Sequence, residues 1–187
     1  MFEFTYLQCF IAIILGWILT RTIIWTKAKK AGEEINAKRI VLRELQLLLV
    51  LICLLVIARI VYFPWHHVNG HIGTLTFDSS KILPLRINLK PIVRLTDVYD
   101  GWQMNIIGNI TMFIPVGIIW PICFKKLDRL WKTLLAGAAY SLLIEISQLL
   151  FYQRSTDIDD LLLNSSGVLI GAIIYFGIRK IIQIIKR

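Results

Sequence analysis

The chain is poor in charge, proline and cysteine for its 187 residues, and these shortages exclude several classes of protein. Charged residues make up 18%, against about 25% in an average soluble domain. The three cysteines lie in apolar stretches without paired spacing, which argues against a disulfide scaffold and favours small buried side chains. No glycine-rich phosphate loop, nucleophile elbow, EF-hand loop or H-E-x-x-H motif occurs. The common signatures of nucleotide, hydrolase and metal sites are therefore missing.

Apolar residues, by contrast, are abundant and come in blocks about 20 residues long. They make up 57% of the chain, and the mean hydropathy is +0.68. A block of that length matches a hydrocarbon layer about 30 Å thick at a rise of about 1.5 Å per helical residue. We therefore predict a single all-α domain over residues 1–187, a polytopic membrane helical bundle of about five transmembrane helices. The expected spans are 4–24, 45–63, 105–124, 131–151 and 161–178.

The net charge of +9 is distributed in a way that predicts the orientation in the membrane. Basic residues gather in alternate connections, which is the positive-inside pattern. This pattern places residues 26–44, 125–130 and 179–187 in the cytoplasm. The N-terminus, the long loop 64–104 between the second and third helices, and residues 152–160 are then outside. We expect the C-terminus to be cytoplasmic. Membrane lipids are the expected partners rather than nucleic acid, since no nucleic-acid recognition element accompanies the charge.

The long extracellular loop 64–104 reads as a folded or membrane-hugging cap rather than a linker. Residues 74–77 and 86–90 alternate with period two, which is typical of short strands. Residues 92–95 are an alternative, a segment that lies flat on the membrane surface. The sequence does not choose between these two arrangements of the cap.

Polar residues inside the last three apolar blocks share one predicted level in the membrane. Each block carries a pair spaced three or four residues apart, so each pair lies on one helix face. The pairs are Asn105 with Asn109, Glu145 with Gln148, and Asp160 with Asn164. All six are near the outer ends of their helices, so the five-helix topology predicts that they meet in one outward-facing site. A charged residue at the bilayer centre costs about 2.5–3.5 kcal/mol, so Glu145 is expected to face the bundle interior, with Arg59 as a candidate partner.

Simpler explanations exist for several of these residues. The asparagines can serve only to bond neighbouring helices. Asp157 fits a helix N-cap, and acidic residues just after it favour the positive end of the helix dipole. Gly167 and Gly171 fit close helix packing. The histidines at 66, 67 and 71 and the nearby carboxylates do not match a metal-ligand spacing, so we predict no metal and no cofactor.

Two ordered motifs stand out in the last three apolar blocks. The first is Asn105-x-x-Gly-Asn109-x-x-x-Phe-Ile-Pro115-x-Gly117. The second is Glu145-x-x-Gln148 followed by Arg154, Asp157, Asp160, Asn164, Gly167 and Gly171. Both resemble signatures of the VanZ-like family, and the resemblance covers most of residues 45–178. The segment Asn88-Leu89-x-Pro91 is similar to the family's N-L-I-P-F, with Lys90 and Ile92 in place of its usual apolar and aromatic residues.

The resemblance implies an integral membrane protein of the bacterial cell envelope. The family takes its name from a member that raises resistance to teicoplanin, a glycopeptide antibiotic that acts on cell-wall precursors outside the membrane. Other members have no such role, and no settled reaction comes with the family. Whether this chain is an enzyme is therefore left open.

Three functional hypotheses follow. In the first, the chain is a non-catalytic or accessory membrane protein that acts at the outer leaflet. It limits the access of a glycopeptide such as teicoplanin or binds an envelope lipid or lipid-linked cell-wall precursor, with the glycopeptide antibiotic itself as a further candidate partner. In the second, it is an enzyme acting on a lipid-linked substrate, with Glu145 or Asp160 as acid or base. The expected substrate contacts are Asn105, Asn109, Gln148, Arg154, Asp157, Asn164 and Arg59, with an arginine holding any phosphate. A small transporter or lipid flippase is the third hypothesis, and the apolar inner halves of the helices disfavour it.

Overall fold

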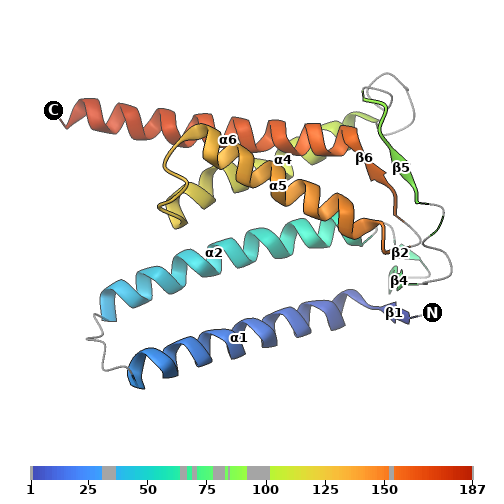
Figure 1. Cartoon of the computed structure of the whole chain (residues 1–187), viewed down its shortest axis with the longest axis horizontal. Coiled ribbons are helices and arrows are strands. Elements are labelled where there is room, and N and C mark those ends of the chain that lie inside the picture. Colours follow the sequence, from blue (N-terminus) through green and yellow to red (C-terminus); the bar gives the residue numbers. More distant parts are fainter. Residues whose placement is uncertain are drawn as a thin grey trace. The chain divides into compact units, whose positions relative to one another are not determined.

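The computed structural model is mostly helical and falls into two compact units (Figure 1). The units are Met1–Thr76 and Phe77–Arg187. The structure describes residues 2–30, 37–63, 67–68, 71–77, 83, 85–91, 102–151 and 154–186. Within these residues there are five helices and six short strands, so the all-α prediction is corrected to a mostly helical fold with small strand pairs. The single-domain prediction remains a prediction.

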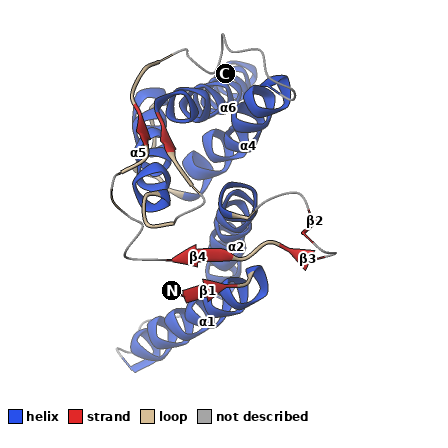
Figure 2. Ribbon diagram, turned by 90° about the vertical axis from the view of Figure 1, so that its right-hand side faces the viewer, coloured by secondary structure: helices blue, strands red, loops and turns tan. Residues whose placement is uncertain are grey.

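The first unit is built on two long apolar helices. Its elements are β1 (Phe2–Phe4), α1 (Tyr6–Lys30), α2 (Ala37–Tyr62), β2 (His67–Val68), β3 (His71–Ile72) and β4 (Leu75–Phe77), whose last residue belongs to the second unit. β1 lies beside β4, and β2 pairs with β3 (Figure 2). At the start of α1, the Thr5 hydroxyl accepts from the Gln8 amide nitrogen at 3.3 Å, and the Gln8 side chain accepts from Thr5 N at 3.0 Å. This reciprocal capping box fixes where α1 begins.

The second unit is a three-helix layer with a strand pair at one end. Its elements are β5 (Ile87–Asn88), α4 (Trp102–Cys123), α5 (Leu130–Gln148), β6 (Thr156–Asp157) and α6 (Ile158–Ile185). α6 packs against both α4 and α5, and the side chains of Phe113, Val116 and Val168 between them are fully buried. β5 and β6 pair in parallel beside the start of α6 (Figure 1).

Glycines bring α4 and α6 into backbone contact. A Cβ added at Gly167 would lie 2.1 Å from the Ile110 carbonyl oxygen, and one at Gly171 would lie 2.2 Å from that of Ile114. Only hydrogen fits in these positions, as in small-residue contacts between membrane helices. Because contacts advance along both helices in the same direction, α4 and α6 are parallel, and their N-termini lie at the same end. The expectation that Gly167 and Gly171 serve close packing is confirmed.

Among the described residues, four helices are long and apolar enough to cross a membrane: α1, α2, α4 and α6. This composition is that of a membrane protein. α5, with 19 residues, is not among them, and it carries the charged residues Lys132 and Glu145. Four of the five predicted spans are therefore matched by helices that could cross a membrane, and the predicted span 131–151 corresponds to α5.

Several predicted helix limits were wrong. α1 continues to Lys30 and α2 already begins at Ala37, so much of the expected connection 26–44 is helical. α6 continues to Ile185 instead of 178. Lysine and arginine are good helix formers, so a helix runs on beyond the apolar block that marks the span. α5 stops early, at Gln148, because the chain turns at 149–150 and Phe151 then pairs with Phe77.

The loop between the second and third predicted helices is described only in part. The alternating segments 74–77 and 86–90 contain strands β4 and β5, as predicted. Residues 92–95 and 152–153, the N-terminal Met1 and the side chains of all three histidines lie outside the described residues. The placement of this loop outside the cell remains a prediction.

Candidate functional site

The start of α6 is fixed by a buried aspartate. Asp157 is only 1% exposed, and its carboxylate accepts from Asp159 N at 3.0 Å, which makes it the N-cap of α6, as predicted. The Asn88 amide donates to both carboxylate oxygens at 3.3–3.4 Å from the neighbouring strand. Asp157 therefore ties β5, β6 and α6 together and orders the backbone from which the site is built.

Glu145 anchors the same point from α5. Its side chain is 3% exposed, and Oε2 accepts from Asp157 N at 2.9 Å. The Thr156 hydroxyl donates to the Glu145 carbonyl at 2.6 Å. A carboxylate buried in this way is stabilised by charge-assisted hydrogen bonds from backbone donors. The geometry makes Glu145 a residue that positions β6 against the end of α5.

The contact that links α4 to α6 is made by Asn109 and Asp160. The Asn109 amide donates to Asp160 Oδ1 at 2.8 Å and to Asn105 Oδ1 at 3.1 Å. All three side chains are half-buried, so they keep an accessible edge. The structure thus brings together Asn105, Asn109 and Asp160 from two helices, at the end where Glu145 and Asp157 also lie.

Asn164 lies one turn deeper on α6. Its amide donates to the Ser141 hydroxyl of α5 at 2.9 Å, and both side chains are almost fully buried. Within the described part of the chain, Asn164 Oδ1 has no hydrogen-bond partner. A buried acceptor left in this condition costs about 1–3 kcal/mol. Asn164 therefore bonds α5 to α6 and also presents an unsatisfied oxygen beneath Asp160.

The remaining predicted site residues differ in their relation to this cluster. Gln148 is the last residue of α5 and is 7% exposed, and its carbonyl accepts from Phe151 N. Arg154 is half-buried between Phe151 and β6, and burial lowers the pKa of its guanidinium from the ordinary value. Arg59 belongs to the first unit, where it donates to the Phe63 carbonyl at 3.0 Å and lies over the Tyr6 ring. Its pairing with Glu145 remains a prediction.

Three contributors were missed by the sequence analysis: Asn88, Ser141 and Thr156. Ser141 could have been predicted from the sequence, since it precedes Glu145 by four residues and shares its helix face. Asn88 was quoted only as part of a motif, because nothing local indicates that it meets a residue 69 positions away. Thr156 acts through its hydroxyl on a backbone carbonyl, a contact without a sequence pattern.

The electrostatic character of the cluster is acidic and rich in amides. Glu145, Asp157, Asp159 and Asp160 surround the N-terminus of α6, whose dipole favours negative charge. Carboxylates and amides together suit ligands that donate hydrogen bonds, such as sugar hydroxyls, peptide amides and amines. Among the described residues, no group of three or more histidine, cysteine or acidic side chains is placed to hold a metal ion.

Comparison with known proteins identifies the family. The family model described as VanZ/LLP1 matches residues 47–182, which is more than half of the chain and includes α4, α5 and most of α6. No curated protein and no solved structure matches.

Proposed function

This chain belongs to the VanZ-like family, and from that premise we propose that it binds an envelope lipid or lipid-linked cell-wall precursor through the cluster at the N-terminus of α6. The observation that carries the proposal is the 2.8 Å bond between Asn109 and Asp160. It joins two helices, is half-exposed, and rests on the buried Glu145 and Asp157. Such a preorganised pair can contact a ligand without rearranging the helices.

Asp160 and the amide oxygens of Asn105 and Asn109 support a ligand that donates hydrogen bonds, because these carboxylate and amide oxygens are acceptors. All three side chains are half-buried, so they keep an edge that a ligand can reach. The headgroup of a wall precursor, with sugar hydroxyls and peptide amides, has these donors. By binding the precursor, the protein would limit the access of a glycopeptide antibiotic such as teicoplanin to that precursor.

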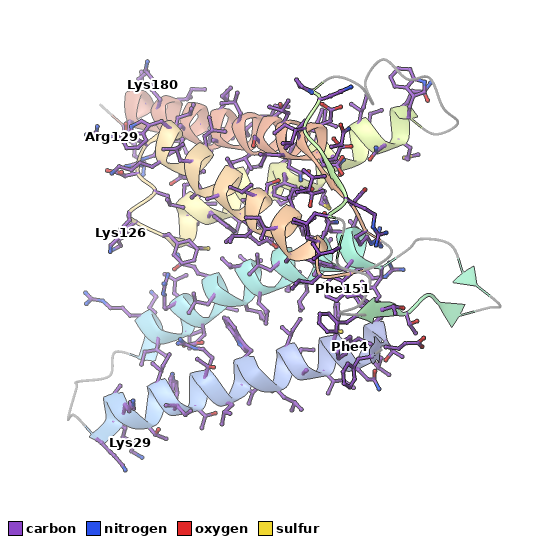
Figure 3. The ribbon with its side chains drawn as sticks, turned by 45° about the vertical axis from the view of Figure 1, so that its right-hand side comes forward. Phe4, Lys29, Lys126, Arg129, Phe151 and Lys180 are labelled. Carbon is purple, nitrogen blue, oxygen red and sulfur yellow. The ribbon has the colours of Figure 1, made fainter. Side chains whose placement is uncertain are left out.

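The site must face the outside of the cell for this function, and the geometry supports that orientation. α4 and α6 are parallel, so the C-terminus of α4 and the N-terminus of α6 lie at opposite ends of the unit. α5 connects these two ends and therefore has to return across the membrane. We infer that α5 is a fifth span, in which the buried Glu145 is covered by β6. Lys126, Arg129 and Lys180 lie at the end of the second unit opposite Phe151 (Figure 3). The positive-inside rule then places Phe151 and the cluster outside.

Binding is tested with a photoreactive polyprenyl-diphosphate disaccharide-pentapeptide added to membranes that contain the chain. We expect crosslinking to the parent and its loss in Asn109→Ala and Asp160→Asn. Ser166→Ala is the matched control, because this residue of α6 is exposed and its hydroxyl donates to the Leu162 carbonyl of its own helix. Equal crosslinking of the parent and both site variants would contradict the proposal.

Resistance is tested separately in a teicoplanin-susceptible host that expresses each variant. The parent should raise the inhibitory teicoplanin concentration, and Asn109→Ala should abolish the increase while Ser166→Ala keeps it. If the parent binds the precursor but gives no protection, the binding function stands and the antibiotic role is removed.

An enzyme acting on a lipid-linked substrate is the second candidate, and the surroundings of Asp160 favour it. Of the two acidic candidates, Asp160 is half-exposed and held by an amide, whereas Glu145 is buried against backbone. Asp160 is therefore the proposed acid or base. Mass spectrometry of lipids and wall precursors from cells expressing the parent or Asp160→Asn tests this candidate, and identical profiles would exclude it.

A further inference from the structure

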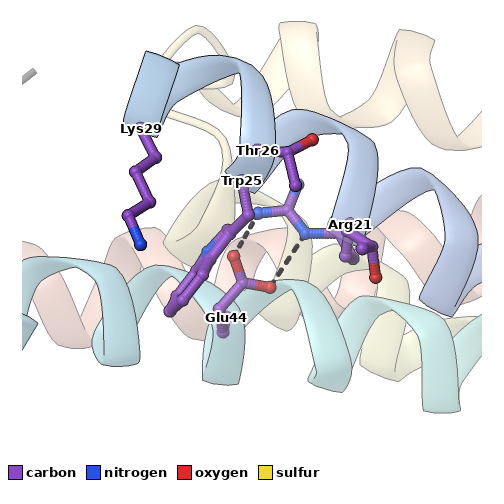
Figure 4. Close-up of a pocket in the computed structure, with 6 residues that line it drawn as sticks. Arg21, Trp25, Thr26, Lys29 and Glu44 are labelled. Atoms are coloured by element: carbon purple, nitrogen blue, oxygen red, sulfur yellow. Dashed lines mark hydrogen bonds and ion pairs between the residues drawn. The ribbon is translucent and has the colours of Figure 1, made fainter. Parts of the chain in front are cut away.

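A groove lies between α1 and α2 of the first unit, far along the sequence from the polar cluster. Its volume is about 330 Å³. It is lined by Arg21, Thr22, Trp25, Thr26, Lys29 and Glu44. Five of these residues belong to the last three turns of α1, and Glu44 faces them from α2 (Figure 4). The groove therefore lies near the C-terminal end of α1.

An ion pair forms the polar wall of the groove. Arg21 Nε donates to Glu44 Oε2 at 2.9 Å, and a second contact joins the Arg21 guanidinium to Oε1. Both side chains are partly exposed. Since this pair is close to neutral, the ammonium of Lys29 leaves the lining with one net positive charge. The Trp25 ring and the Lys29 side chain extend toward α2 on the same side of Arg21 (Figure 4).

The surrounding segment adds to this positive charge. Residues 21–44 contain seven basic and three acidic residues. Basic residues at the cytoplasmic end of transmembrane helices attract anionic lipid headgroups, each contributing about 1 kcal/mol. An indole ring at the same level is typical of the membrane interface. Charge and level therefore both match a phospholipid headgroup.

The apolar surface beside the groove matches the rest of a lipid. None of the residues of α1 is buried, and Ile18, Leu48 and Leu49 are large exposed side chains on the two helices that flank the groove. Such surfaces are stable only against hydrocarbon. A molecule with a charged headgroup and long apolar chains can cover both the charged groove and the apolar faces of α1 and α2.

We propose that the groove between α1 and α2 binds an anionic diacyl phospholipid. The phosphate lies against Lys29 and the Arg21–Glu44 pair. The glycerol lies near Thr22 and Thr26, whose hydroxyls donate to carbonyls of α1 itself and can only accept from a lipid. The acyl chains follow the apolar faces of α1 and α2. This site is independent of the cluster on α6, so either proposal can fail without the other.

Native mass spectrometry of the full chain in detergent tests the preference for an anionic headgroup. The protein is titrated with phosphatidylglycerol and with phosphatidylcholine of the same acyl chains. We expect phosphatidylglycerol to bind more tightly, and Lys29→Gln to weaken it about fivefold, which corresponds to about 1 kcal/mol. Lys38→Gln is the matched control, because it removes the same charge from the start of α2 but not from the groove lining.

Fluorescence quenching tests where the lipid binds. Phosphatidylglycerol with brominated acyl chains should quench Trp25, so the quenched component should be smaller in Trp25→Phe than in the parent. The proposal is overturned if the two lipids bind equally, if Lys29→Gln and Lys38→Gln weaken binding equally, or if Trp25→Phe leaves the quenched component unchanged.

Discussion

Glu145 and Asp160 are acidic residues of the same cluster, but their surroundings assign them different roles. Glu145 is buried, and its carboxylate is engaged by the backbone of β6. Asp160 is half-exposed and is held by the amide of Asn109 from another helix. A carboxylate satisfied by backbone fixes the chain, whereas one with an accessible edge can reach a ligand. At the residue scale, Asp160 is therefore the residue that we propose contacts a ligand.

Substitution of Glu145 should reveal its positioning role. Glu145→Ala leaves the buried Asp157 N–H without its acceptor and should lower the free energy of unfolding by about 2–3 kcal/mol. Glu145→Gln keeps an acceptor oxygen and should cost about 1 kcal/mol. Unfolding of the purified protein by SDS in mixed micelles measures both. Equal losses for the two variants would show that the hydrogen bond to Asp157 is unimportant.

The bond between Asn164 and Ser141 can be measured by a double-mutant cycle. Hydrogen bonds between membrane helices contribute about 0.6–1.7 kcal/mol. Asn164→Ala and Ser141→Ala, alone and together, should give a coupling energy in that range because the two side chains bond directly at 2.9 Å. A coupling energy of zero would mean that this bond does not hold α5 and α6 together.

Among the elements, the contact between α4 and α6 is the one on which the cluster depends. Gly167 and Gly171 let the two backbones touch, and Gly117 of α4 meets the Val168 carbonyl from the other side. Asn109 and Asp160 lie above this contact, toward the N-termini of both helices. Any side chain inserted at the glycines separates the helices and lengthens the bond between Asn109 and Asp160.

Alanine in place of Gly167 should therefore destabilise the protein by about 1–3 kcal/mol, the usual cost of overpacking. The same exchange at Gly177 is the matched control. Gly177 is also in α6, and a Cβ added there meets nothing within 4 Å. Alanine is the better helix former, so Gly177→Ala should be neutral or stabilising by up to about 1 kcal/mol. SDS unfolding compares the two, and similar effects would refute close packing at Gly167.

Much of the architecture could be predicted from the sequence because the relevant signals are local. Apolar blocks of about 20 residues indicate membrane helices, and Asp157 before an apolar run indicates an N-cap. Helix ends such as Lys30 and Gln148 could not be predicted, since charged residues continue a helix and a tertiary strand pair ends one. The pairing of β5 with β6 joins segments 69 positions apart, and no local pattern specifies that register.

For the six polar residues of the site, too, some features could be predicted from the sequence and others depend on tertiary contacts. Their common level followed from helix spacing, and the bond between Asn109 and Asp160 agrees with that expectation. Their unequal burial did not follow, because it depends on which face of each helix the neighbours cover. Asn164 donates to Ser141 and Glu145 accepts from the backbone of β6, two contacts that helix spacing alone did not predict.

On the scale of the whole molecule, the account depends on which side of the membrane the cluster faces. Lys126 and Arg129 follow α4 at one end of the second unit, and Phe151 and β6 are at the other (Figure 3). Ser155, directly before β6, and Lys126 are both exposed. Cysteines at these two positions therefore test independently the two sides of the membrane that the five-span topology predicts.

Labelling with a membrane-impermeant thiol reagent tests this orientation most directly. Cys9, Cys53 and Cys123 are first replaced by alanine, and Ser155→Cys or Lys126→Cys is then introduced. In intact cells the reagent should label the cysteine at 155 at once, and the cysteine at 126 only after the membrane is permeabilised. The opposite result, with position 126 labelled in intact cells and position 155 protected, would place the cluster in the cytoplasm and contradict its proposed action on the cell envelope.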